Sequence, residues 1–318
     1  MGQNGKKIWL KFEADADDPY SGNVYIADEQ MDEHYHDWSF HNSLSESTDH
    51  FYTFIYNGSI IDNKLRSLSG QHIANYKNLF DAVTLAKANN PSTTEMWNIE
   101  CIADHILIQM LTVLIFKTIN IFDGLGYGLT RGSGTAAVLE TFLTGVHDKK
   151  GLFYGTDNTS PTTFDDSVKL FGMESYYGTI ERRINGLLNY YNTYKIKLTY
   201  GTEDGSMREG YDDKNPFTSG NGYKYVQCEI PSPVTGGAVN KMKFTEDGLF
   251  PVMFGGNSPY TNSWAMINTN MNYSTNIGRY WGRGVEGGLF GMSMINSYNA
   301  SNMWYIGFNL TCKPVIQE

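Results

Sequence analysis

Basic clusters, cysteine motifs and long apolar runs are all scarce in this sequence of 318 residues. The formal net charge is −10, and no run of basic residues is longer than a doublet such as Lys149-Lys150 or Arg182-Arg183. Nucleic-acid binding requires a basic face, so we expect no nucleic-acid partner. The three cysteines, Cys101, Cys228 and Cys312, are odd in number and form no CxxC motif. We therefore expect buried free thiols rather than a disulfide framework.

The most apolar run, 106–116, is too short to cross a bilayer, and the first residues contain no long apolar stretch. We expect no transmembrane segment, no membrane insertion and no signal peptide. His34 and His36 lie in an acidic stretch, 32–38, with His41 following. Imidazoles and carboxylates are good metal ligands, but the spacing does not match a helical zinc pair, so we favour a solvated loop.

Glycine and tyrosine are abundant, with 33 and 22 residues, and hydrophobic residues make up 41% of the chain. This composition allows a sizeable core and favours many short strands joined by turns. We expect 201–250 to be acidic and loop-like. Strands are predicted at 8–12, at 24–26, at 51–56 before an Asn57-Gly58 turn, at 151–155, at 168–174, and at 194–200 with Lys195 and Lys197 facing out.

Two helices are predicted in the first half. The segment 75–88 is amphipathic and is ended by Asn89-Asn90-Pro91. The segment 92–95, Ser-Thr-Thr-Glu, has the form of a capping box, so a second, buried helix is predicted to start there and run to about Thr118. We interpret His105 on this helix as a core histidine. The glycines of 123–128 are too weak a nucleotide motif, because a helix precedes them, and we interpret them as a tight turn.

The C-terminal stretch has two kinds of residue. From Trp304 to Cys312, large apolar residues alternate with smaller or polar ones, which predicts one strand with one buried face. The preceding segment 297–302 has no apolar residue larger than Ala300 and is interpreted as a displayed loop. A strand frame that carries polar and aromatic loops is typical of a binding surface.

An ordered set of motifs gives a family resemblance over about residues 50–314: 64–70, the predicted helix at 93–119, 126–128, 150–155, 168–174, 177–178, 254–256, 288–290 and 304–310. The sequence resembles the C-type-lectin-fold proteins related to the formylglycine-generating enzyme. Among these it is most similar to the variable and receptor-binding proteins of phages and other prokaryotic viruses, some of which are diversified by retroelements.

The resemblance implies an α+β, C-type lectin-like, turn-rich fold with two helices and short antiparallel strands. It implies a β-rich segment at 1–70, part of the same domain, and a ligand-binding domain at 71–318 with a variable surface at about 257–305. Gly282, Gly284, Gly287, Gly288, Phe290, Ile306, Gly307 and Phe308 would be scaffold. Trp304 is interpreted as packed under the surface. The expected ligand-binding residues are Tyr260, Asn262, Tyr280, Trp281, Arg283, Val285, Glu286, Ser297, Tyr298, Asn299, Ser301, Asn302, Met303 and Tyr305.

The function that this resemblance implies is binding without catalysis. The expected partner is a host cell-surface protein or glycan, and the expected location is a virion tail or a cell surface. Tyr, Ser, Asn and Gly dominate 255–309, which agrees with an antibody-like binding surface. We expect no catalytic residue, no metal site and no cofactor. Asp213 and Asn215 form only a fragment of a calcium loop, so we favour a solvated loop there, and calcium is kept as an alternative.

Two other functions stay open. One is a metal-dependent enzyme of the same fold, although the C-terminal cysteine pair of the oxidising relatives and the helical histidine pair of the iron-dependent relatives have no match in this sequence. The other is a structural virion or adhesin subunit that forms a homo-oligomer.

Overall fold

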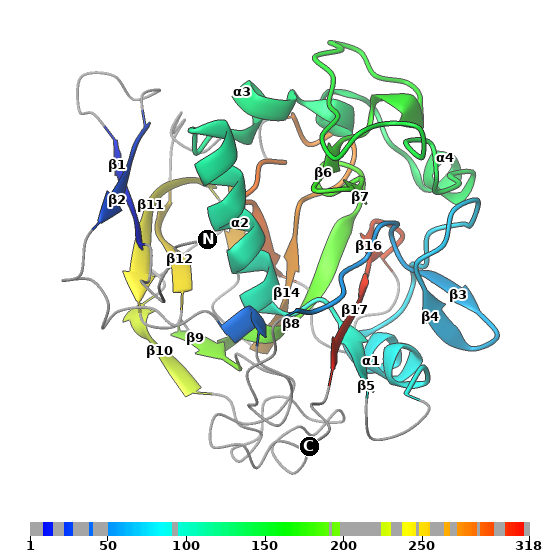
Figure 1. Cartoon of the computed structure of the whole chain (residues 1–318), viewed down its shortest axis with the longest axis horizontal. Coiled ribbons are helices and arrows are strands. Elements are labelled where there is room, and N and C mark those ends of the chain that lie inside the picture. The colour runs from blue at the N-terminus through cyan, green and yellow to red at the C-terminus, as the bar shows by residue number, and fades with distance from the viewer. Residues whose placement is uncertain are drawn as a thin grey trace.

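The computed structural model (Figure 1) describes residues 9–14, 22–27, 38–40, 50–90, 95–190, 193–197, 224–229, 237–245, 248–254, 264–267, 272–284, 287–295 and 303–314. The described helices are α1 (Leu79–Lys87), α2 (Ile102–Phe116), α3 (Ile121–Leu125), α4 (Ala136–Glu140) and the 3-10 helices η2 (Trp38–Phe40), η3 (Gly128–Arg131) and η4 (Phe164–Asp166). The described strands are β1 (Trp9–Ala14), β2 (Gly22–Ala27), β3 (Ser59–Ile61), β4 (Lys64–Arg66), β5 (Glu95–Ile99), β6 (Lys169–Leu170), β7 (Met173–Glu174), β8 (Glu181–Tyr190), β9 (Thr193–Ile196), β10 (Lys224–Glu229), β11 (Gly237–Thr245), β12 (Gly248–Phe254), β13 (Trp264–Ile267), β14 (Asn272–Ile277), β15 (Met292–Met294), β16 (Ile306–Gly307) and β17 (Leu310–Pro314).

One nine-stranded sheet holds most of the longer strands, in the order β10-β9-β8-β14-β15-β13-β11-β12, with β16 on β8. The pairs β13–β15 and β16–β8 are parallel, and the other pairs in this sheet are antiparallel. Four two-stranded sheets complete the described strands. The expected α+β class with short, mostly antiparallel strands is confirmed.

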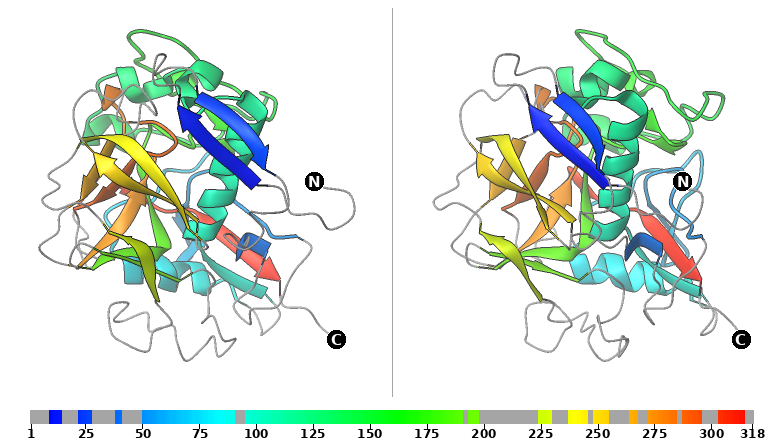
Figure 2. Two further views of the ribbon diagram at one scale, coloured as in Figure 1. Left: turned by 90° about the vertical axis from the view of Figure 1, so that its left-hand side faces the viewer. Right: turned by 60° about the vertical axis from the view of Figure 1, so that its left-hand side comes forward.

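Helix α2 lies against one face of the large sheet, as the turned views show (Figure 2). Its buried Ile102 and Ile106 pack into a core cluster with apolar side chains of six strands, β8, β9, β11, β12, β14 and β15. Burial of such side chains is the main stabilising contribution, at roughly 1.5–3 kcal/mol each. Further along the helix, Ile108 and Val113 enter a second cluster with the α3 segment and the 168–177 turn region. The prediction that this helix is central and buried is confirmed.

Helix α1 shows how local sequence sets its bounds. The side chain of Asn78 caps the first turn by accepting from the Asp81 amide at 2.8 Å. Leu79, Ala82, Val83 and Ala86 form its buried face, the spacing that an amphipathic helix requires. The helix ends at Lys87, just before the predicted Asn-Asn-Pro stop. Its start lies a few residues later than the predicted residue 75.

The start of the second helix was predicted wrongly. Residues Glu95–Ile99 form strand β5, which pairs antiparallel with β17, and α2 begins only at Ile102. Asp104, on the first turn of α2, accepts a hydrogen bond from the Cys101 amide at 3.3 Å. The helix is therefore capped here and not at the 92–95 motif, which has only the sequence form of a capping box. Pairing with the distant C-terminal strand therefore overrode a local helix signal.

The first hairpin turn was also misplaced. Asn57 and Gly58 are buried rather than forming the turn, and a side chain at Gly58 would overlap the Phe308 carbonyl. The observed turn joins β3 to β4 at Asp62 and Asn63, both with positive φ (51° and 56°). Two consecutive left-handed residues are the geometry of a tight hairpin turn, which Asp and Asn tolerate. Residue Tyr52 makes an isolated bridge to Cys312 instead of belonging to a strand.

The predicted single strand at 304–312 is two strands with a break at Phe308 and Asn309. β16 pairs with β8, while β17 pairs with β5 in another sheet. All residues from 306 to 313 are buried, so the expectation of one buried face is wrong. The alternation was real in the sequence, but the segment is covered on both sides because it crosses between two sheets.

Several smaller expectations also change. Lys195 and Lys197 are buried, at 8% and 1% exposure, rather than facing out. The predicted strand at 168–174 is a hairpin of β6 and β7, and the 201–250 region contains β10, β11 and part of β12. Cys101 and Cys312 are buried and form no disulfide, as predicted, while the side chain of Cys228 lies outside the described part of the chain. In the part of the chain that is described, no helix has the length and apolarity needed to cross a membrane.

Candidate ligand-binding site

Two C-terminal segments meet at the beginning of strand β8. β14 runs antiparallel to β8, so its last residue, Ile277, lies opposite Arg182. β16 runs parallel to β8, so its first residue, Ile306, lies opposite Glu181. The chain leaving β14 and the chain entering β16 are therefore brought to the same end of β8. Strand direction thus places 278–284 and 303–305 at one end of β8.

An aromatic cluster forms where these segments meet. The rings of Tyr280 and Tyr305 stack with centroids 4.4 Å apart. Trp304 contacts both rings edge-on, with centroids 5.5 Å from each. The Arg283 guanidinium lies 4.4 Å from the Tyr280 ring centroid and also donates to the Tyr280 hydroxyl. We call Tyr280, Arg283, Trp304 and Tyr305 the aromatic patch.

The aromatic patch is half-buried, so each side chain combines a fixed position with an accessible part. Trp304 packs at its base against a core cluster that includes Phe142 and Ile180, in partial agreement with the expectation that it lies under the surface. The side-chain amide of Asn75 donates to the Trp304 carbonyl at 3.0 Å, and the Glu181 amide donates to the Tyr305 carbonyl at 2.8 Å. These bonds fix the backbone that carries the rings.

A buried ion pair lies next to the aromatic patch in the sequence. Arg279 donates to Glu181 at 2.9 Å, and both side chains are about 1% exposed. Arg279 has a left-handed backbone (φ 47°), an uncommon conformation for a residue other than glycine. Burial raises the pKa of the Glu181 carboxyl, while Arg279, Arg283 and Arg183 act in the opposite direction. The Arg279–Glu181 pair therefore places a compensated buried charge next to Tyr280 in the sequence.

Trp281 does not belong to the accessible site, contrary to the sequence expectation. It is 3% exposed and contacts Phe164 edge-on, with centroids 5.1 Å apart. Gly132 and Gly134 make room for it, because a Cβ at Gly134 would lie 2.6 Å from the Trp281 Cβ. Trp281 is a buried anchor that holds the segment carrying Tyr280 and Arg283.

The structure brings together three of the residues expected to bind ligand, Tyr280, Arg283 and Tyr305, and all three are half-buried. Met303, two residues before Tyr305, is also half-buried. The following residues lie outside the described ranges: Tyr260, Asn262, Val285, Glu286, Ser297, Tyr298, Asn299, Ser301 and Asn302. Residues 32–37 of the acidic, histidine-containing stretch, His41 and the Asp213–Asn215 fragment also lie outside them. Within the described ranges, no group of three His, Cys, Asp or Glu side chains is placed to hold a metal ion.

The structure explains why several of the expected scaffold positions carry glycine or a large apolar residue. Gly282 and Gly284 have positive φ (85° and 55°), which glycine adopts without strain. Phe290, Ile306 and Phe308 are core residues. A side chain at Gly307 would lie 2.9 Å from Ile180 and 3.1 Å from the Ala74 carbonyl.

A second buried charge group lies behind β8. Arg182 donates to Glu100 at 2.8 Å, and its guanidinium lies 3.8 Å from the Tyr176 ring centroid. His105 shares a 2.9 Å hydrogen bond with the Tyr176 hydroxyl, which confirms it as a buried core histidine. Burial raises the pKa of Glu100 to about 7 although Arg182 lowers it, and burial lowers the pKa of His105. These groups are enclosed, so we assign them to the support of the sheet.

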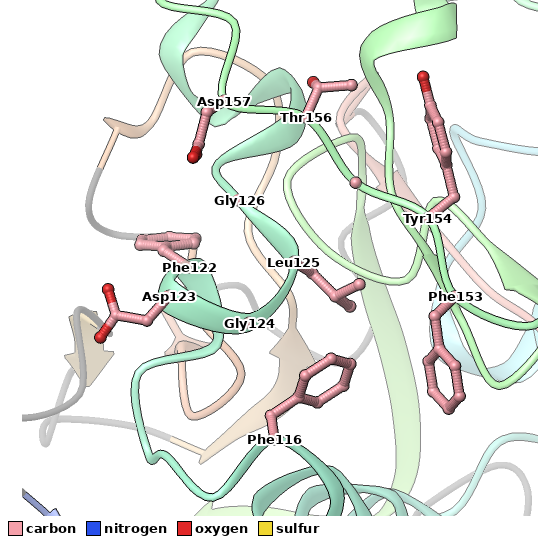
Figure 3. A pocket seen from close by; sticks show the side chains of 11 residues that line it. Phe116, Phe122, Asp123, Gly124, Leu125, Gly126, Phe153, Tyr154, Thr156 and Asp157 are labelled. Carbon is pink, nitrogen blue, oxygen red and sulfur yellow. The ribbon is translucent and has the colours of Figure 1, made fainter.

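Sequence reasoning missed a groove of about 470 Å³ between the end of α2, α3 and the 153–157 loop (Figure 3). Its apolar lining includes Phe116, Phe122, Leu125 and Phe153, and its acidic residues are Asp123 and Asp157. The groove could have been suspected from the glycines of 123–128 and 151–155, which we interpreted only as turn and strand signals. Sequence reasoning also missed the buried pair of Glu181 and Arg279, which lie 98 residues apart and carry no local signal of their contact.

Comparison with protein-family profiles gives no match, and comparison with curated proteins gives no significant match.

Proposed function

We propose that the protein is a non-enzymatic ligand- or receptor-binding protein and that the aromatic patch is part of its binding surface. The observation that carries this proposal is the meeting of Tyr280 and Arg283 with Trp304 and Tyr305 at the beginning of β8. Tyr, Trp and Arg are the residue types that dominate binding energy at protein interfaces. Four such side chains in mutual contact and partly accessible form a surface of that kind.

The support beneath the patch favours binding by a preorganised surface. Ring stacking, the Asn75 and Glu181 backbone contacts and the buried Trp281 restrict the patch before any ligand arrives. Restricting side chains in advance lowers the entropic cost of association, roughly 0.5–1.5 kcal/mol for each immobilised side chain. The glycines 282 and 284 allow the backbone of this segment to turn without strain.

The finer part of the proposal follows the family resemblance. We infer a C-type lectin-like fold, a tail-associated or cell-surface location, and a host surface protein or glycan as partner. Diversification by a retroelement would act on 257–305, which includes the two segments of the patch. A Tyr- and Asn-rich surface suits protein and glycan partners alike.

A binding screen tests the general function. The purified full chain is applied to an array of glycans and to an array of cell-surface ectodomains. We expect saturable binding to one or a few related ligands on one of the arrays. Binding to neither array contradicts the proposed function.

Comparison of the same locus in related genomes tests the diversification. We expect substitutions concentrated at 257–305 that spare Trp281, Gly282, Gly284 and Phe308, with a reverse transcriptase gene nearby. Substitutions spread evenly along the chain, or concentrated elsewhere, would remove this part and leave the binding proposal intact.

A further inference from the structure

The groove at α3 owes its shape to two chain segments that touch through glycines. A side chain at Gly126 would overlap the Thr156 carbonyl, and one at Gly155 would overlap the Leu125 carbonyl. Gly126 also has a positive φ (80°). The two segments, 125–126 and 155–156, therefore approach each other backbone to backbone. Neither glycine contributes a side chain that would fill the groove.

One part of the groove is aromatic and remains accessible. Phe116 and Phe153 contact each other edge-on, with centroids 5.5 Å apart, and Phe153 contacts Phe171 at 5.1 Å. Phe153 is 37% exposed, and its neighbour Leu152 is 65% exposed. Ile115, next to Phe116, is 49% exposed. Apolar surface thus continues from the groove onto the surrounding face, as at contact sites for other macromolecules.

The polar groups of the groove accept hydrogen bonds. Asp123 and Asp157 are exposed carboxylates, drawn on the opposite side of Figure 3 from Phe153. The two lining hydroxyls already donate within the chain, Tyr154 to the Asp165 carbonyl at 3.2 Å and Thr156 to the Asp166 carbonyl at 3.3 Å. Among the eleven residues that line the groove, none is Lys, Arg, His, Asn or Gln. A ligand that donates hydrogen bonds and carries positive charge matches these side chains.

We propose that this groove binds an arginine or lysine side chain of a partner protein. The aliphatic stem lies against Phe116 and Phe153, and the cationic head is held by Asp123 and Asp157. Long basic side chains combine these two properties, since their methylene groups cover apolar surface while the charge stays solvated. The exposed Ile115 and Leu152 favour a side chain within a polypeptide over a free organic cation, because neighbouring apolar residues of a partner can cover them. The net charge of −10 further favours a basic partner.

Titration of the full chain with three small probes, followed by NMR, tests this site. The probes are acetyl-Leu-Arg-Leu-amide, the same peptide with citrulline in place of arginine, and butylguanidinium. We expect saturable shifts with the arginine peptide, weaker binding of butylguanidinium, and no saturation with the citrulline peptide. Equal binding of the citrulline peptide overturns the requirement for charge, and equal binding of butylguanidinium overturns the choice of a polypeptide partner. Absence of saturable shifts with all three probes overturns the site.

Variants then assign the binding to the groove. D123N/D157N removes both carboxylates with little change in size, and we expect a roughly two- to thirtyfold loss of affinity for the arginine peptide, the range for two exposed ion pairs. D62N/D81N removes two exposed carboxylates elsewhere and should leave the affinity unchanged. Both should keep the melting temperature of the parent chain. Equal affinities of D123N/D157N and the parent chain, or an equal loss in D62N/D81N, overturn the proposal.

Discussion

The ring of Tyr280 stacks on the ring of Tyr305 with centroids 4.4 Å apart, although the two residues come from segments on opposite sides of β8. This contact depends on the opposite directions of β14 and β16 relative to β8. It joins the two parts of the C-terminal region that the sequence marked as candidates for ligand contact. The stacked pair therefore defines the centre of the proposed binding surface.

A side chain added at Gly134, which packs against Trp281, should destabilise the protein. Gly134→Ala places a Cβ about 2.6 Å from the Trp281 Cβ, and we expect it to lower the free energy of unfolding by about 1–3 kcal/mol through overpacking. Gly134 has no positive φ, so the loss reports space rather than backbone strain. Gly151→Ala is the matched control, since a Cβ there meets nothing within 4 Å. Chemical denaturation measures both variants, and equal stabilities would contradict the packing described for Trp281.

The buried pair Lys313–Asp104 should show strong coupling. Their charged atoms lie 2.8 Å apart with side chains 0% and 3% exposed. Lys313→Met leaves the Asp104 carboxylate buried without this partner, and we expect a loss of about 3–5 kcal/mol in the free energy of unfolding.

The double variant D104N/K313M removes both charges and should lose less than Lys313→Met alone. A double-mutant cycle with chemical denaturation gives the coupling energy. The cycle also needs the single variant Asp104→Asn. A double variant that is less stable than Lys313→Met alone would contradict the coupling that we infer.

Glu100 should make stability depend on pH. Burial raises its pKa to about 7 from an ordinary value of 4.5, against the effect of Arg182. Between these values the folded protein binds more protons than the unfolded chain, so this contribution to stability falls as pH rises. We expect the stability difference between the parent chain and Glu100→Gln to fall across this window, by at most about 1.4 kcal/mol per pH unit.

His105 should change stability with pH in the opposite direction to Glu100, so the two effects must be distinguished. Its pKa is lowered by burial, so its contribution to stability increases as pH rises through its ordinary value of 6.5. Because His105 is present in both proteins, the difference between them reports Glu100 together with its interaction with His105, whose Nδ1 lies 3.9 Å from the Glu100 carboxylate. Denaturation midpoints at several pH values measure this difference. A difference that stays constant or grows with pH would contradict the assignment.

Local signals predicted some elements well and failed where distant segments pair. The amphipathic pattern of α1 and the apolar run of α2 are properties of contiguous residues, so both helices could be predicted. The strand at Glu95–Ile99 could not, because it exists through pairing with Leu310–Pro314. The burial of Lys195 and Lys197 likewise depends on neighbours contributed by other strands, which alternation in one segment does not reveal.

The candidate site was predictable in its residue types more than in its geometry. Tyr280, Arg283 and Tyr305 were expected to face a ligand because they interrupt a glycine and apolar framework, and all three are partly accessible. Trp281 was misassigned because a large aromatic residue next to polar residues has the same sequence pattern whether its ring is buried in the core or exposed to a ligand. Only the glycines at 132 and 134, far away in the sequence, show that a pocket for its ring exists.

Binding by a variant of the aromatic patch tests the central claim most directly. Y280A/R283A removes the guanidinium–ring pair whose separation is 4.4 Å, and Lys150→Ala removes a cation at the same 4.4 Å from the Tyr154 ring in another segment. For a ligand identified on the arrays, we predict at least a tenfold loss of affinity for Y280A/R283A, a change that corresponds to about 1.4 kcal/mol. We predict no loss for Lys150→Ala, with melting temperatures close to that of the parent chain in both. Unchanged affinity of Y280A/R283A, or a loss that only accompanies unfolding, would contradict the assignment of the binding surface.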